Sequence, residues 1–252
     1  MLRRDLQVLL SEAAAGRDDW RIEPPKALIV PHAGYPYSGP IAASAYAPLA
    51  ALRHRIRRVV LLGPTHRVAV VGLALPAATA FQTPLGTVPL DLEAMDILRP
   101  FPQVSVNSAA HALEHSLEVQ LPFLQTVLET FLLVPLAVGM ASPEAVAEVL
   151  EALWGGPETL LVVSSDLSHY LPYAQAQALD GSTCDRIVGL QLLASHEQAC
   201  GATPVNGLLL AARRHGLKAQ LLDLRNSGDT SGDRSSVVGY GAFAFTEGNH
   251  GT

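Results

Sequence analysis

Two histidines follow two short apolar runs of the sequence, at the points where the runs end. His32 comes directly after Ala27–Val30 and one proline, and His66 follows Val59–Leu62 after three residues. Imidazole nitrogens carry protons near neutral pH and bind transition metals. Either histidine alone is more often a hydrogen-bonded structural residue, but a buried ring needs a partner, and one metal ion satisfies several rings together. The shared placement therefore favours a polar or metal site.

A third apolar run brings a carboxylate and another imidazole. Leu160–Val163 leads into the segment SSDLSHY, which contains Asp166 and His169. In open α/β sheets ligands bind at the carboxyl ends of the strands, where loops are held by the strands yet open to solvent. We therefore expect these side chains to lie close to His32 and His66, although no histidine spacing here is a short metal motif such as HExxH.

A second polar cluster lies in the segment HALEHSLEVQLPF, which contains His111, Glu114, His115 and Glu118. On one continuous helix both the histidines and the glutamates would be i, i+4 neighbours, which places two imidazoles or two carboxylates on one face. A helix that begins only near Glu114 would leave His111 outside it. We interpret the cluster mainly as support for a neighbouring site and as surface capping, with direct metal binding as the weaker alternative.

Four apolar runs, the three above and Leu132–Val138, are predicted to be buried strands. Each is rich in Val, Leu or Ile and apolar throughout, as expected when helices cover both faces of a sheet. Phe81–Leu90 is predicted to form a hairpin and Val237–Phe245 a late strand. Helices are predicted around Leu6–Ala13, at Gly39–Leu52 with Ser38 as the cap, at Glu114–Leu128 with a bend at Pro122, from Pro143 up to Gly155 with Ser142 as the cap, at Asp180–Leu193 and at Pro204–His215.

The composition fits one layered domain. The chain has 252 residues, of which 49% are hydrophobic and 16% charged, and its mean hydropathy is +0.25. Because strands alternate with helices, we predict a single α/β domain over residues 1–252, with a central mixed, mostly parallel sheet flanked by helices. The net charge of −6 argues against nucleic acid or an anionic membrane as the main partner, since both require a basic surface.

Cysteine content and the N-terminus indicate a reducing compartment. The chain has two cysteines, Cys184 and Cys200, which excludes a secreted disulfide framework, and we expect Cys184 to pack in a helix without a disulfide partner. The N-terminal segment carries Asp5 and Glu12 around only a short apolar stretch, unlike a signal peptide. No apolar run approaches the ~20 residues of a transmembrane helix. We therefore expect a cytoplasmic protein.

Several motifs together resemble one known family. They occur in order from Ala27 to Phe245 as PHAGYPYSGPIAASAY, LLGPTH, EHSLEVQLPFL, VVSSDLSHY, CGATPVNGLLLA and SSVVGYGAFAF. These segments are similar to those of the Memo family, whose bacterial members are also called AmmeMemoRadiSam system protein B. The resemblance implies a fold like that of the extradiol, class III non-haem iron dioxygenases. It also implies a pocket of two histidines and a cysteine that holds iron or copper.

Carried over by residue, the resemblance assigns the metal ligands to His32, His66 and Cys200, and places Asp166 and His169 in the same pocket. Without it, Cys200 alone would be taken for an inert buried thiol. Two neutral imidazoles and a soft thiolate suit Fe²⁺, copper or zinc, whereas magnesium and calcium prefer oxygen ligands. We expect iron (Fe²⁺), with copper or zinc as alternatives.

Three functions remain open at this point. The first is a redox-active metalloprotein, either an oxidoreductase of unknown substrate or an iron or copper handling protein, in which His169 is the acid or base and Asp166 orients an imidazole or binds substrate. Ring cleavage does not follow, because Cys200 stands where the dioxygenases have a carboxylate. The second is a non-catalytic module that captures an anionic group or a peptide of a partner, and the resemblance implies radical SAM and AMMECR1-type proteins as partners. The third is Cys200 as a metal-independent nucleophile.

Overall fold

The computed structural model describes residues 1–15 and 23–248. At the centre of the fold four parallel strands lie side by side in the order β1, β8, β2, β7. Each consists almost entirely of buried side chains, which confirms the apolar runs as strands covered on both faces. Their bounds are Ala27–Val30 for β1, Thr159–Ser164 for β8, Arg58–Pro64 for β2 and Leu132–Val138 for β7.

Antiparallel pairings extend this parallel centre on both sides, so that nine strands of the described residues form one mixed sheet. On one side β11 pairs with β1, β10 and β9, all antiparallel. On the other side β3 is antiparallel to β7 and parallel to β6, while β4 and β5 form the predicted hairpin. Their bounds are β11 Val237–Glu247, β10 Leu217–Asn226, β9 His169–Leu171, β3 Leu73–Leu75, β6 Val104–Val106, β4 Ala80–Thr83 and β5 Gly86–Pro89.

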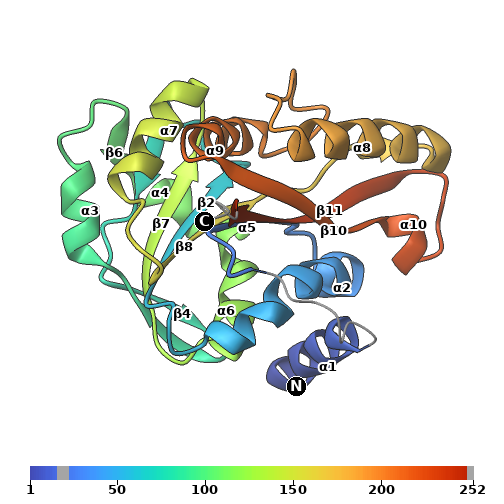
Figure 1. Cartoon of the computed structure of the whole chain (residues 1–252), viewed down its shortest axis with the longest axis horizontal. Coiled ribbons are helices and arrows are strands. Elements are labelled where there is room, and N and C mark those ends of the chain that lie inside the picture. The colour runs from blue at the N-terminus through green and yellow to red at the C-terminus, as the bar shows by residue number, and fades with distance from the viewer. Residues whose placement is uncertain (16–22, 249–252) are drawn as a thin grey trace.

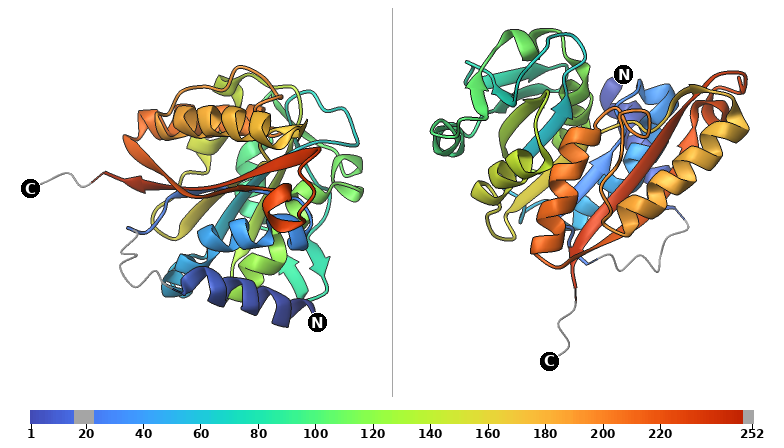
Figure 2. Two further views of the ribbon diagram at one scale, coloured as in Figure 1. Left: turned by 90° about the vertical axis from the view of Figure 1, so that its right-hand side faces the viewer. Right: turned by 90° about the horizontal axis from the view of Figure 1, so that it is seen from above.

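Helices cover both faces of the sheet, as Figures 1 and 2 show. One layer contains α1 and α2 with α6, and the opposite layer contains α7, α8 and α9. In the described ranges no helix is both long enough and apolar enough to cross a membrane. The bounds are α1 Leu2–Ala14, α2 Tyr35–Tyr46, the 3-10 helix η1 Ala47–Leu52, α3 Leu92–Leu98, α4 Ala109–Ala112, α5 His115–Glu118, α6 Gln120–Val127, α7 Pro143–Ala152, α8 Tyr173–Val188, α9 Ala202–Arg214 and α10 Ser227–Thr230.

The start of α2 differs from the prediction. The helix begins at Tyr35 with Gly34 as its N-cap, and Ser38 lies inside it, where its hydroxyl donates to the carbonyl of Ala33 at 2.7 Å. Pro36, at the first turn, needs no hydrogen-bonded N–H there, so the chain enters the helix four residues earlier than Gly39. The first turn of α2 therefore follows the loop of His32 directly, which fixes that loop against the helix layer.

Two further predicted helices have other limits. The segment 114–128 is broken at Val119 into α5 and α6, because Pro122 has no N–H for the carbonyl of Glu118. The helix predicted at 180–193 is α8, which begins after Pro172 and ends before Gly189. By contrast α7 has the predicted cap, since the side chain of Ser142 accepts from the backbone N–H of Ala145 at 3.1 Å.

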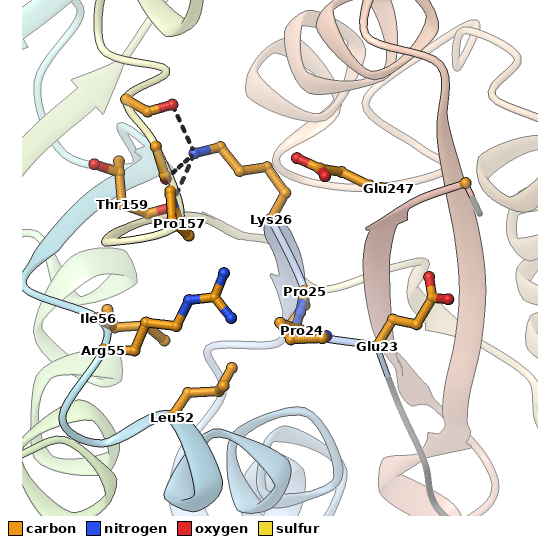
Figure 3. Close-up of a pocket in the computed structure, with 13 residues that line it drawn as sticks. Glu23, Pro24, Pro25, Lys26, Leu52, Arg55, Ile56, Pro157, Thr159 and Glu247 are labelled. Atoms are coloured by element: carbon orange, nitrogen blue, oxygen red, sulfur yellow. Dashed lines mark hydrogen bonds between the residues drawn. The ribbon is translucent and has the colours of Figure 1, made fainter. Parts of the chain in front are cut away.

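Lys26 directly precedes β1, at the end of the sheet opposite the histidine loops. Its side chain lines the pocket shown in Figure 3. Its ammonium group donates to the carbonyl of Trp154 and, at 2.9 Å, to that of Gly156, both in the turn after α7. It also donates, at 3.0 Å, to the carbonyl of Thr159 at the start of β8. Burial lowers the pKa of Lys26 to about 8, and Glu158 opposes that shift, so the side chain is mostly charged at neutral pH. The lysine therefore links the start of β1 to the turn after α7 and to the start of β8.

We expect Lys26→Met to lower the free energy of unfolding by about 2 kcal/mol or more, because several carbonyls lose a charged donor. Urea denaturation followed by circular dichroism measures this change. Lys218→Met, at an exposed position of β10, is the matched control and should change stability by less than about 0.5 kcal/mol. Equal effects of the two substitutions would contradict the assigned role of Lys26.

Candidate metal centre

The carboxyl ends of three central strands meet at one edge of the sheet. Val30 of β1 is in register with Ser164 of β8, and Leu62 of β2 is in register with Val163. The loops that leave these strands contain His32, His66 and Asp166, as the sequence predicted. The rigid parallel strands therefore hold the three loops at one place.

Three imidazole rings form a cluster at this edge. The ring centroids of His32 and His66 are 5.2 Å apart, those of His66 and His115 are 5.1 Å apart, and those of His32 and His115 are 5.5 Å apart. One nitrogen from each ring lies within 4.8 Å of the other two, which makes this the His/Cys/Asp/Glu group of the described residues suited to a metal ion. Three nitrogens at such spacing match the ligand set of a transition metal.

His32 is the buried member of the cluster. Its ring is 2% exposed, its Nδ1 lies 2.9 Å from the hydroxyl of Ser164, and its Nε2 lies 3.3 Å from the Sγ of Cys200. Burial lowers the pKa of His32 to about 4, although the carboxylate of Asp166 acts in the opposite direction. The ring is therefore neutral at physiological pH, the form in which histidine binds a metal.

Glu114 holds the second ring. Its carboxylate accepts from the Nδ1 and the backbone N–H of His66, at 2.9 and 2.5 Å, and from the backbone N–H of Ser116 at 3.0 Å. The same carboxylate lies 3.5 Å from the Nδ1 of His115. Because a carboxylate only accepts, His66 carries its hydrogen on Nδ1 and leaves the lone pair of Nε2 for a metal. Glu114, and not only the strand ends, thus orients the site.

The carboxylate of Glu114 makes the stability of the protein depend on pH. Burial alone would raise its pKa, but the hydrogen bonds from His66 and Ser116 outweigh burial and bring the pKa from 4.5 down to about 2. Since the pKa is lower in the folded state, the stabilisation is fully present above pH ~4.5 and is lost as the pH falls through about 2. Its size is on the order of 3 kcal/mol.

We therefore expect Glu114→Gln to be clearly less stable than the wild type at pH 6, and this difference to shrink as the pH falls from about 4.5 toward 2. Thermal unfolding of both proteins across this pH range, without metal, measures the difference. A gap in stability that stays constant over the range would show that the carboxylate charge is not what stabilises the loop.

Cys200 reaches the site from the chain that enters α9. Its backbone N–H donates to the carbonyl of Asp166 at 3.2 Å, and the N–H of Gly201 donates to the hydroxyl of Ser165 at 2.9 Å. A Cβ on Gly201 would lie only 2.7 Å from the Cβ of Ser165, so glycine permits this close approach. Burial and the charge of Asp166 raise the pKa of Cys200 to about 12, so the group is a thiol unless a cation binds it. Both cysteines are free, and Cys184 is buried in α8.

Asp166 contacts the loop of His32, whereas His169 lines the same cavity as His66 and Cys200. One carboxylate oxygen of Asp166 accepts from the backbone N–H groups of His32 and Ala33 at 2.7 and 3.3 Å, and the other lies 3.9 Å from the Nε2 of His32. The Nδ1 of His169 donates to the carbonyl of Leu167 at 2.9 Å, so in the neutral ring the Nε2 carries the lone pair. Asp166 thus fixes the His32 loop, and His169 offers a base.

A cavity of about 570 Å³ opens in front of these groups. Its walls include Leu171 and Leu179 beside imidazole, carboxylate and thiol groups, a combination found where small ligands bind. The polar residues that line it are His66, His169, His196, Glu197 and Cys200.

Most residues that meet at this site were named from the sequence, but His115 was given too little weight. The structure brings Cys200, His66 and Asp166 around His32, as expected. Glu114 has the supporting role predicted for its cluster, but His115 also places its ring among the site imidazoles.

The remaining members of the segment HALEHSLEVQLPF lie apart from the imidazole cluster. The Nε2 of His111 bonds to the carbonyl of Ala74 at 2.9 Å, and Glu118 is exposed. The signal for His115 was the pair Glu114-His115 at the start of a helix, where the N-cap and the first helical residue can present both side chains to the same loop.

Comparisons with known proteins agree on one family. A family model described as "Memo-like protein" matches residues 1–244. A MEMO1 family protein of Methanopyrus kandleri is 38% identical over 236 residues, which cover 88% of this chain and 83% of that protein. A MEMO1 family protein of Sulfolobus acidocaldarius is 36% identical over 231 residues, 86% of this chain and 81% of its own length.

A solved structure has the same fold. The crystal structure of uncharacterized protein JW3007 from Escherichia coli K12 superposes with a TM-score of 0.57 at 15% identity, over 86% of this chain and 98% of that one. At this identity the likeness extends to the fold, and the predicted α/β architecture with a mixed central sheet is confirmed.

Proposed function

This chain belongs to the Memo family, and from that premise we propose that it binds one transition-metal ion at the edge of its sheet and uses it in redox chemistry. The observation that carries the proposal is the cluster of His32, His66 and His115, whose nitrogens lie within 4.8 Å of one another. The second ring nitrogen of His66 is hydrogen-bonded to Glu114, as metal-binding histidines commonly are.

The donor set favours iron, copper or zinc. Neutral imidazoles are ligands for these ions, and a thiolate adds a soft donor that magnesium and calcium do not seek. We propose His32, His66 and Cys200 as the ligands, with Fe²⁺ as the first expectation. His115 is the competing third ligand, because its ring lies in the imidazole cluster, whereas the thiol of Cys200 is placed at the site by its 3.3 Å contact with the Nε2 of His32.

A bound iron or copper ion would supply electron transfer and would polarise an oxygen-containing ligand. The protein groups around it have separate tasks. The Nε2 of His169 would hold or accept a proton of the substrate, and Asp166 would keep the loop of His32 in place through two backbone N–H groups. Leu171 and Leu179 would give the same cavity an apolar wall against which a substrate could pack.

The alternative function is a non-catalytic module that captures an anionic group or a peptide of a partner protein, and radical SAM and AMMECR1-type proteins are the proposed partners. The observation in its favour is that His66, His169 and His196 line one cavity and would attract an anion when protonated. A metal-independent cysteine nucleophile is less well supported, because Cys200 and His32 face each other as thiol and neutral imidazole rather than as an ion pair.

Anaerobic reconstitution with Fe²⁺, Cu⁺ or Zn²⁺, followed by metal analysis after gel filtration, separates these functions. One equivalent of iron or copper together with oxygen consumption in a substrate panel supports the redox function. Stoichiometric zinc or no metal, with tight binding of a phosphorylated or carboxylated peptide, supports the binding module. Metal-free protein whose Cys200 is alkylated rapidly at pH 7 would support the nucleophile.

A further inference from the structure

Gln120 is a fully buried polar residue of the EHSLEVQ segment. Its Nε2 donates to the carbonyl of Pro31 at 2.9 Å and to the hydroxyl of Ser164 at 2.8 Å, and its Oε1 accepts from the hydroxyl of Tyr46 at 2.9 Å. A backbone carbonyl can only accept, so the amide nitrogen must face Pro31. This orientation also turns an N–H toward Ser164.

Ser164, at the carboxyl end of β8, has one hydroxyl hydrogen and three polar neighbours. The carbonyl of Ser116 lies 2.6 Å from its Oγ and can only accept, so the hydrogen of Ser164 is used there. The remaining neighbours are the Nε2 of Gln120 and the Nδ1 of His32 at 2.9 Å. Both must therefore donate to the oxygen of Ser164.

We propose that Gln120 and Ser164 are positioning residues, which hold His32 with its hydrogen on Nδ1 and its Nε2 lone pair toward Cys200. The proton position follows from hydrogen bonds alone. The consequence of this proton position, that the imidazole can bind a metal without first losing a proton, rests on the proposed function.

The chain of hydrogen bonds from Gln120 through Ser164 to His32, here called the relay, is closed to water. Ser116, Gln120 and Ser164 are each 0% exposed, and His32 is 2% exposed. A carboxylate oxygen of Asp166 lies 3.9 Å from the Nε2 of His32, beyond hydrogen-bond distance but close enough to attract a hydrogen placed on that nitrogen. Without Ser164, the form of His32 with its hydrogen on Nε2 would become the more stable one. Ser164 is therefore needed to keep the hydrogen on Nδ1.

Long-range ¹⁵N–¹H NMR spectra of metal-free protein at pH 7.5 distinguish the nitrogen that carries hydrogen from the one that does not. In the wild type we expect the hydrogen of His32 on Nδ1. In Ser164→Ala it should move wholly or largely to Nε2, and in Gln120→Met, where Ser164 loses the N–H that holds its oxygen in place, a fraction of the Nε2 form should appear. Ser164→Thr keeps the hydroxyl and should restore the wild-type spectrum.

Zinc serves as the probe of metal affinity, because it is redox-inert. Ser164→Ala should bind it ~10 to 100-fold more weakly than the wild type, and Ser164→Thr should recover the affinity. A variant that merely loosened packing would lose affinity without moving the hydrogen of His32.

The proposal is overturned if wild-type His32 carries its hydrogen on Nε2, or if Ser164→Ala and Gln120→Met leave it on Nδ1. A wild-type protein with the predicted hydrogen position that binds no zinc would instead refute the proposed metal function and leave the relay standing. The two failures are therefore distinguishable.

Discussion

His32→Ala is expected to abolish stoichiometric metal binding. His32 contacts Cys200 through its Nε2 and also lies in the imidazole cluster with His66 and His115, so it belongs to either possible ligand set. Its loss should lower zinc affinity by more than the ~10 to 100-fold that changes to supporting residues cost. Titration against a competing chelator, with metal analysis of the folded variant, measures the loss.

Three other variants make this experiment specific. His54→Ala removes an exposed histidine paired with Glu129 and should leave metal affinity unchanged. Asp166→Asn and His169→Ala should retain the metal within ~100-fold while changing ligand binding or oxygen reactivity. Complete metal loss in both of these variants, at the level of His32→Ala, would show that they are ligands themselves.

The sequence predicted the elements that carry the site because burial on both faces has a clear signature. The four central strands appear as apolar runs, and β1, β2 and β8 end where a loop with polar side chains begins. By contrast β10 has a mixed pattern of exposed and partly buried residues, and β3, β6 and β9 are only three residues long. Such strands depend on their neighbours in the sheet, so no local pattern reveals them.

The sequence predicted which residues form the candidate site better than it predicted the contacts between them. Strand ends placed His32 and His66, whereas Cys200 required the resemblance to a family, since a lone cysteine before a helix has no distinctive spacing. The bonds of Gln120 and Ser164 join residues 44 positions apart, and the approach of His115 depends on where a broken helix begins. Neither is encoded in a local pattern.

The choice between Cys200 and His115 as third ligand can be decided by counting protons. Burial and the nearby Asp166 raise the pKa of Cys200 to about 12, so at pH 7.5 the free protein carries a thiol there. A metal binds the thiolate, and the proton must leave as the bond forms. A neutral histidine releases none.

We therefore expect the wild type to release about one more proton per zinc ion than Cys200→Ser, as measured by calorimetry in buffers of different ionisation enthalpy. The difference in proton release between the two proteins cancels the protons released by water bound to the metal. With Co²⁺ in place of zinc, the wild type should show thiolate charge-transfer absorption that Cys200→Ser lacks, and His115→Ala should keep it. Equal proton release and equal affinity in wild type and Cys200→Ser, with loss of metal in His115→Ala, would instead make the site a three-histidine centre and Cys200 a bystander.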